Sequence, residues 1–266
     1  MNKFILKVRR FFWTYRQPLT LIPRKQGAPI SDLFIWRKSK HWQTGFELTD
    51  IGSLFDNEII QKKPAKALFI LFDLSGKELG RHLLTAPRFK STQVDISALL
   101  TNCIDEIGTF CVLHLSTPSA LLQLGSNITE RGYLSYMYCN TPARAYVHGN
   151  FDAVSMNVDG RVERLAGKSF FQREFHLQYL FEETGVYEVV LVNPSSDQQR
   201  ITFEVLSVVS GKEVTSFTTN IPSGGLKVFT IPTNNLAQRV IIKSYLIMAR
   251  PIIFYRENSK LAVFHG

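Results

Sequence analysis

Hydrophobic and polar residues alternate along much of the chain with a period of two, which is typical of β-strands. In residues 66–74 every second position is leucine, isoleucine or phenylalanine from Leu68 onward. The run ends at Ser75-Gly76, a pair that tolerates a positive φ, and the chain then resumes in a second apolar run. The pattern predicts a β-hairpin, followed beyond Pro87 by a third strand.

The same pattern occurs a second time. Residues 66–97 and 201–232 align without a gap at an offset of 135 positions, so that Ser75-Gly76 falls on Ser210-Gly211 and Pro87 on Pro222. Residues 145–149 and 262–266 also resemble each other, and both end in His-Gly. We therefore expect two copies of one unit, each built around a three-stranded β-meander.

Short strands at regular spacing, with turn residues between them, predict an all-β fold. We expect two tandem, internally repeated β-sandwich domains of jelly-roll or Ig-like type, preceded by a short basic amphipathic N-terminal helix. The expected boundaries are residues 1–27 for the arm and linker, 28–149 for the first sandwich and 150–266 for the second.

Composition supports packed cores, since 45% of the residues are hydrophobic and twenty are phenylalanine. The three cysteines, Cys103, Cys111 and Cys139, form neither a CxxC motif nor an even set. They predict free thiols in a reducing compartment. We expect no metal site and no cofactor, because neither ligand clusters nor nucleotide-binding motifs are present.

Positive charge is concentrated at the N-terminus. Seven lysines and arginines precede Asp32, the first acidic residue, and removing these seven from 31 basic residues leaves 24 against 22 acidic ones. Seven of the nine net positive charges therefore belong to the arm, and the nearly neutral body argues against nucleic-acid binding.

The arm also has the spacing of an amphipathic helix that ends before Pro18. Three alternatives stay open: the helix packs on the protein's own sheets, lies on an anionic membrane, or binds a protein or nucleic-acid partner through residues 1–25. We expect a cytoplasmic protein, with peripheral membrane association in the second case, since no secretory signal or spanning segment is evident. The residues expected to make membrane or partner contact are Phe4, Lys7, Val8, Arg9, Arg10, Phe11, Phe12 and Trp13.

Two histidines are candidate site residues because they end the two copies. In a pseudo-symmetric pair, His148 and His265 could face each other or line a shared cleft, where an imidazole can donate or accept a proton near neutral pH. The alternative is that each bonds a local backbone group.

A second candidate is the segment 131–138, which combines a cation with three tyrosines. Arg131, Tyr133, Tyr136 and Tyr138 are the residue types of a sugar-binding or peptide-binding face, because rings stack on apolar surfaces while polar groups fix orientation. The alternative is a structural strand with half-buried tyrosines.

These observations favour a non-catalytic binding or scaffold protein over an enzyme. The alternative is a carbohydrate-active enzyme or glycan-binding protein with its site at the inter-domain cleft, where Asp152, Asp159 or Glu163 could do acid and base work near His148. Glycan, membrane surface and protein partner all remain candidate ligands, and the oligomeric state is undetermined.

Overall fold

The fold was analysed in a computed structural model, which describes residues 27–54, 65–88, 90–101, 103–115, 127–139, 143–149, 153–182, 184–231 and 236–266. The expected N-terminal helix and its eight contact residues lie outside these ranges. The described helices are one turn each, η1 (Ile51–Leu54) and α2 (Ile96–Leu99).

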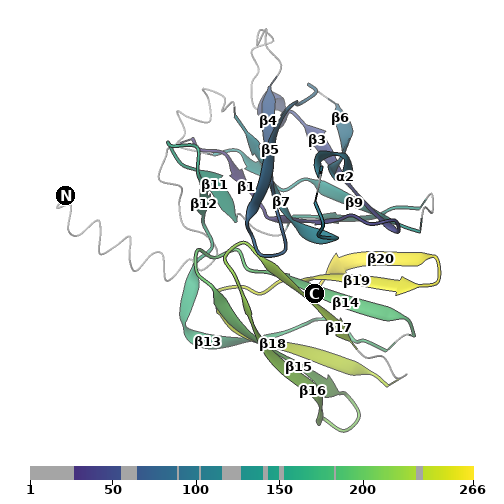
Figure 1. The fold of residues 1–266 in the computed structure, drawn as a ribbon. Coiled ribbons are helices and arrows are strands. Elements are labelled where there is room, and N and C mark those ends of the chain that lie inside the picture. Colours follow the sequence, from purple (N-terminus) through teal and green to yellow (C-terminus); the bar gives the residue numbers. More distant parts are fainter. Residues whose placement is uncertain are drawn as a thin grey trace, which may run out of the picture.

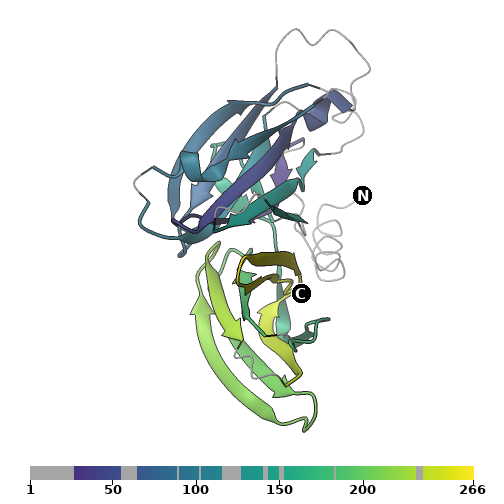
Figure 2. The same ribbon diagram turned by 90° about the vertical axis from the view of Figure 1, so that its right-hand side faces the viewer.

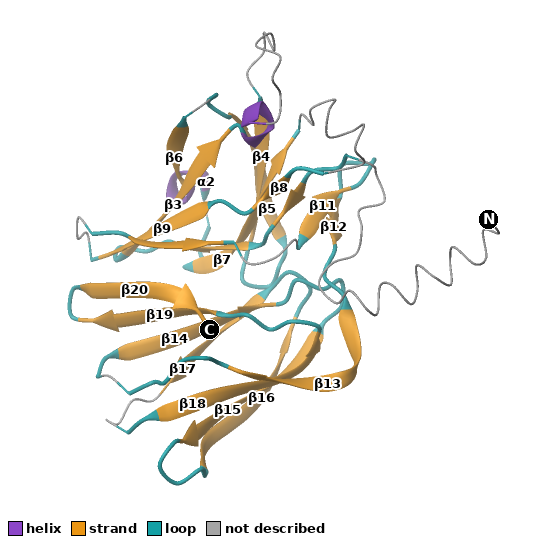
Figure 3. Ribbon diagram, turned by 180° about the vertical axis from the view of Figure 1, so that it is seen from behind, coloured by secondary structure: helices purple, strands orange, loops and turns teal. Residues whose placement is uncertain are grey.

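All other regular elements among the described residues are strands (Figures 1 and 3). In chain order they are β1 (Ile30–Ser31), β2 (Phe34–Arg37), β3 (Trp42–Thr49), β4 (Lys66–Phe72), β5 (Glu78–Thr85), β6 (Ser91–Asp95), β7 (Ile107–His114), β8 (Thr129–Glu130), β9 (Tyr133–Tyr138), β10 (Ala145–His148), β11 (Val154–Met156), β12 (Val162–Arg164), β13 (Lys168–His176), β14 (Val186–Val192), β15 (Gln199–Ser207), β16 (Glu213–Ile221), β17 (Leu226–Ile231), β18 (Gln238–Leu246), β19 (Ile252–Glu257) and β20 (Lys260–His265).

The prediction of two tandem sandwiches behind an N-terminal helix is wrong. The described strands form five four-stranded sheets, which is the number and size of the blades in a five-bladed β-propeller. We number them sheet 1 (β12-β11-β1-β8), sheet 2 (β2-β7-β4-β5), sheet 3 (β10-β9-β3-β6), sheet 4 (β17-β14-β19-β20) and sheet 5 (β13-β18-β15-β16). Each sheet contains one hairpin of two consecutive strands, and its other two strands come from elsewhere in the chain, so crossovers connect the sheets.

Sheet 4 explains why separate sandwiches were the wrong expectation. On β14, Tyr187, Val189 and Leu191 belong to the core shared with sheet 5, whereas Val190 belongs to the core shared with sheets 2 and 3. Sheet 4 is thus buried on both faces and lies between sheets 3 and 5 (Figure 1). A strand buried on both faces reads as a continuous apolar run, and residues 189–192 are one.

Sheet 1 adds a further layer on the outer face of sheet 2. Its contact is a small core that joins Val154 of β11 to Ile70 and Cys111 of sheet 2. Sheet 1 takes β1 and β8 from before the expected boundary at residues 149–150, and β11 and β12 from after it. Figure 2 shows the resulting molecule from the side, with sheets 4 and 5 beneath the other three.

The repeat is present in the connectivity. Sheets 2 and 5 have the same strand order when β2, β7, β4 and β5 are matched to β13, β18, β15 and β16, and sheets 3 and 4 correspond in the same way. The β4–β5 and β15–β16 turns each contain a glycine with positive φ, Gly76 at 82° and Gly211 at 66°.

The expected three-stranded meander is wrong in its third strand. β6 pairs with β3 in sheet 3, and β17 pairs with β14 in sheet 4, so neither continues the sheet of its hairpin. Pro87 and Pro222 stand where the chain leaves, and proline has no N–H to extend the ladder of the preceding strand.

Candidate functional site

A pocket of about 420 Å³ lies between the first copy and sheet 4. It is lined from the first copy by the β2–β3 connection, β9 and the start of β7, and from the second copy by β14, β17 and β19. The lining residues are Arg37, Ser39, Lys40, His41, Trp42, Glu106, Ile107, Tyr138, Glu188, Val228 and Arg256. We call it the arginine pocket, because two arginines dominate its polar contacts.

Arg37 is the buried arginine of this pocket, with only 5% of its surface exposed. Its guanidinium carbon lies 4.3 Å from the centre of the Trp42 ring and 4.4 Å from that of Phe254, which holds the planar group between aromatic faces. Its Nη1 donates to Glu188 Oε2 at 2.7 Å. This ion pair connects β2 of sheet 2 to β14 of sheet 4.

Arg256 approaches the same carboxylate from β19. Its Nη2 lies 3.2 Å from Glu188 Oε2, and its Nη1 donates to Tyr138 Oη at 3.0 Å. The Arg256 guanidinium also lies 5.1 Å from the centre of the Tyr138 ring. One carboxylate is therefore shared by two guanidinium groups.

Each of these arginines has one buried hydrogen-bond donor that is left unpaired by the described residues. The Nε of Arg37 and the Nε of Arg256 are buried and make no hydrogen bond with any residue that the structure describes. A buried donor without an acceptor costs about 1–3 kcal/mol, so two in one pocket need a physical explanation.

The rim of the pocket is the tight connection between β2 and β3. Ser39 N donates to Trp42 O at 3.1 Å, and His41 N donates to Ser39 Oγ at 3.1 Å, which places Lys40 and His41 at the tip. The His41 Nδ1 lies 3.8 Å from Cys139 Sγ on the chain leaving β9.

The structure brings the two candidate histidines together. The ring centres of His148, on β10, and His265, on β20, lie 4.9 Å apart, where sheets 3 and 4 meet. His148 Nδ1 contacts Gly149 O at 2.6 Å, whereas neither ring nitrogen of His265 makes a hydrogen bond among the described residues. Burial, the Arg250 guanidinium and His148 together lower the pKa of His265 to about 4, against a smaller opposing effect of the His148 backbone. His265 is therefore neutral at physiological pH.

The tyrosines of segment 131–138 are divided among three environments. Tyr136 is fully buried in the main core and donates to Ile35 O at 2.8 Å, and burial raises the pKa of its hydroxyl. Tyr133 is exposed, with its ring 6.3 Å from that of His148, while Tyr138 lines the arginine pocket. Arg131 is exposed, and its backbone carbonyl accepts from Gly149 N at 3.1 Å.

Of the three carboxylates considered beside His148, the structure describes two. Asp159 is in the β11–β12 turn, where its backbone N–H donates to Asn157 Oδ1, and Glu163 is on β12 of sheet 1. Asp152 lies outside the described residues. No group of three or more His, Cys, Asp or Glu side chains in the described part of the chain could hold a metal ion.

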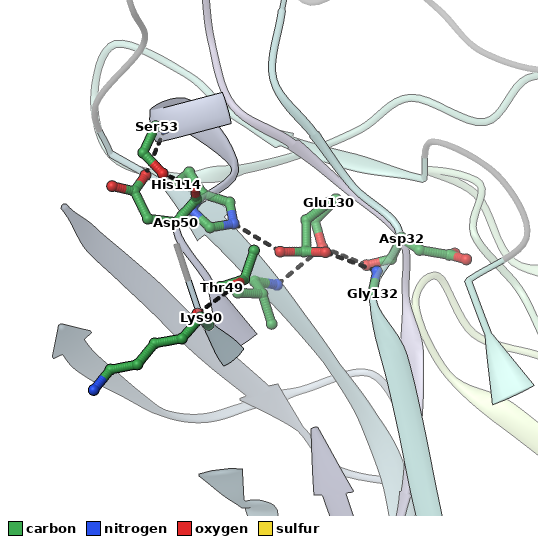
Figure 4. Close-up of polar contacts among 10 residues, drawn as sticks. Asp32, Thr49, Asp50, Ser53, Lys90, His114, Glu130 and Gly132 are labelled. Atoms are coloured by element: carbon green, nitrogen blue, oxygen red, sulfur yellow. Dashed lines mark hydrogen bonds and ion pairs between the residues drawn. The ribbon is translucent and has the colours of Figure 1, made fainter. Parts of the chain in front are cut away.

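A buried dyad that the sequence analysis did not single out joins His114, at the end of β7, to Glu130, at the end of β8 (Figure 4). His114 Nε2 lies 2.7 Å from Glu130 Oε2, and Glu130 Oε1 accepts from Gly132 N at 2.7 Å. Both side chains are nearly inaccessible. The dyad fixes β8 and the start of the β9 connection against sheet 2, which is a structural role.

Sequence reasoning missed Arg37, Arg256, Glu188 and Trp42 of the arginine pocket. Arg37 and Glu188 are 151 positions apart and neither belongs to a recognisable motif. The one available signal was Tyr138, which was selected as part of the aromatic segment.

Within the described residues, no helix is long and apolar enough to cross a membrane. No family model matches the chain, and no curated protein sequence matches it.

Solved structures similar to the chain include three β-glucuronidases. One from glycoside hydrolase family 2 is 8% identical with a TM-score of 0.18 and covers 88% of this chain. A calcium-binding mutant of Bacteroides uniformis β-glucuronidase 2 is 11% identical, with a TM-score of 0.20 over 94% of this chain. The Parabacteroides merdae enzyme is 11% identical, with a TM-score of 0.16 over 92%. The matches span 23%, 28% and 35% of those chains, and at these TM-scores they support no conclusion about fold or function.

Proposed function

We propose that the protein is a non-catalytic binding protein and that its ligand site is the arginine pocket between the two copies. The observation that supports this is a pocket of about 420 Å³ lined by two guanidinium groups, of Arg37 and Arg256, that share one carboxylate, Glu188. A ligand that supplies acceptor oxygens would complete the pairing of these groups, and concave sites with a few fixed polar groups are the usual form of ligand pockets.

Rigidity of the lining favours binding over chemistry. Glu188 is already paired with both arginines, and Arg37 is held between Trp42 and Phe254. Side chains fixed in this way lose little entropy when a ligand binds.

The test is a thermal-shift screen of the full chain against arrayed glycans and small metabolites. A ligand should raise the melting temperature of the wild type, because binding to the native state stabilises it. The shift should shrink in Tyr138→Phe, which removes the hydroxyl that orients Arg256. Tyr245→Phe, on the exposed face of sheet 5, is the matched control and should keep the full shift. A ligand whose shift is equal in both variants would argue against this pocket.

A carbohydrate-active enzyme remains the second candidate, because two carboxylates, Glu106 and Glu188, line the same pocket. Hydrolysis of a glycan by the wild type that is abolished in Glu106→Gln would support it. An inactive wild type across the glycans that bind would leave the binding protein as the better account.

The arm is proposed to dock this binding protein on an anionic membrane or a protein partner. Co-sedimentation with vesicles containing phosphatidylserine should require residues 1–25 and should weaken as salt is raised, because the attraction is electrostatic. Equal sedimentation of a variant lacking these residues would exclude the membrane alternative.

A further inference from the structure

We propose that the ligand of the arginine pocket carries a carboxylate or phosphate group, which binds to the guanidinium groups of Arg37 and Arg256. This inference rests on the proposed function, since it names the chemistry of the ligand that the same pocket takes. Three features of the pocket support it: its charge, the kind of donor that lines it, and the way both guanidinium groups are held.

The pocket has an excess of positive charge. Arg37, Lys40 and Arg256 line it against two acids, Glu106 and Glu188. Both arginines pair with the same carboxylate, that of Glu188. One of the two positive charges is therefore not neutralised by an ion pair. An anion would complete this pairing, and interactions between charges are stronger in a partly buried site than in water.

The guanidinium donors favour an anionic acceptor over a neutral one. A hydrogen bond from a guanidinium to a carboxylate or phosphate oxygen is shorter and roughly twice as strong as one between neutral groups. A ligand hydroxyl would also bring a hydrogen of its own that needs an acceptor, whereas ionised carboxylate and phosphate oxygens only accept. The two guanidinium groups, which only donate, therefore match an acceptor-only group.

The two guanidinium groups are held in place before any ligand binds. Arg37 is fixed by Glu188 and by the rings of Trp42 and Phe254. Arg256 is fixed by Glu188 and by Tyr138, whose ring and hydroxyl it contacts. The planar guanidinium group of arginine can bind a carboxylate or phosphate through two hydrogen bonds. Holding the group in place before the ligand arrives strengthens that binding.

The experiment uses three hexoses that differ only at C6, together with inorganic phosphate. Galactose is neutral there, galacturonate carries a carboxylate, and galactose 6-phosphate carries a phosphate. Binding of each to the full chain is followed by the chemical shifts of the Trp42 indole and by the melting temperature. We expect at least one of the two anionic sugars to bind at least about tenfold more tightly than galactose, since each charged hydrogen bond supplies roughly that factor.

Arg256→Gln is the variant that tests the assignment. It shortens the side chain and replaces the charged guanidinium with a neutral amide, so the preference for the anionic sugars should disappear. Arg239→Gln, at an exposed position on β18 of sheet 5, makes the same change in net charge away from the pocket and should keep the preference.

The two proposals fail in different ways. If galactose binds as tightly as its anionic counterparts and binding still depends on Tyr138, the pocket is a binding site but the inference about charge is wrong. If phosphate and the anionic sugars perturb wild type and Arg256→Gln equally, or perturb neither, the anion assignment is wrong. Preference for galacturonate over galactose 6-phosphate, or the reverse, would identify which of the two anionic groups the site prefers.

Discussion

The internal repeat supplies a pair of matched glycines whose substitution should have unequal effects. Gly76 and Gly211 are the corresponding positive-φ residues of the β4–β5 and β15–β16 turns. The Gly211 turn is open, and a Cβ added there would meet nothing within 4 Å. The Gly76 turn instead packs against residues 223–225 of the second copy, and Leu226 N donates to Leu74 O at 3.1 Å across this contact.

The structure allows the difference to be estimated. Alanine in the left-handed region costs about 1–2 kcal/mol at either position. At Gly76 the new Cβ would also lie 2.6 Å from Gly225 N and closer still to Ser223 O, and these are backbone atoms that cannot rotate away. Displacing them adds about 1–3 kcal/mol of overpacking. Loss of the Leu226–Leu74 hydrogen bond adds about 1 kcal/mol. Gly76→Ala should therefore destabilise by about 2–4 kcal/mol more than Gly211→Ala.

Urea denaturation followed by circular dichroism measures both variants against the wild type, with the free energy of unfolding taken from the midpoint and slope. Gly211→Ala should shift the midpoint slightly, and Gly76→Ala strongly. Losses that agree within about 0.5 kcal/mol would refute the reasoning, because they would mean that the first turn is as open as the second. A larger loss in Gly211→Ala would refute it as well.

Three further outcomes are expected. Glu188→Gln removes the negative charge that two guanidinium groups share. It should lower the free energy of unfolding by about 3 kcal/mol, measured by urea denaturation, and a loss under about 1 kcal/mol would contradict the ion-pair account. Because the folded pKa of His265 is lowered to about 4, its contribution to stability is complete above its unfolded pKa near 6.5 and is lost as the pH falls toward 4. His265→Gln should remove about 1–2 kcal/mol of that pH dependence, a value reduced for partial exposure, and an unchanged pH profile would count against it. Burial raises the pKa of the Cys111 thiol to about 12, so a thiol reagent should modify exposed Cys139 in the native protein and leave Cys111 unreacted until unfolding.

Some residues of the candidate sites could be predicted from the sequence, and others could not. The equivalent places of His148 and His265 in the two copies raised the possibility that they face each other, and their ring centres lie 4.9 Å apart. The arginine pocket had no such signal, because Arg37, Glu188 and Arg256 come from strands without a shared motif. Charged residues that meet only across two sheets leave no spacing pattern in the chain.

The amino-acid sequence alone determined the all-β character, the repeated hairpins and their glycine turns. These features are local: strand periodicity and positive-φ turns involve residues close together in the chain. Tertiary structure alone decided that β6 and β17 leave the sheets of their hairpins, that sheet 4 is buried on both faces, and that the described strands form five sheets. The physical reason is that the second face of a strand is buried by residues far away in the chain. A continuous apolar run indicates that both faces of the strand are covered, but it does not indicate which part of the protein covers them.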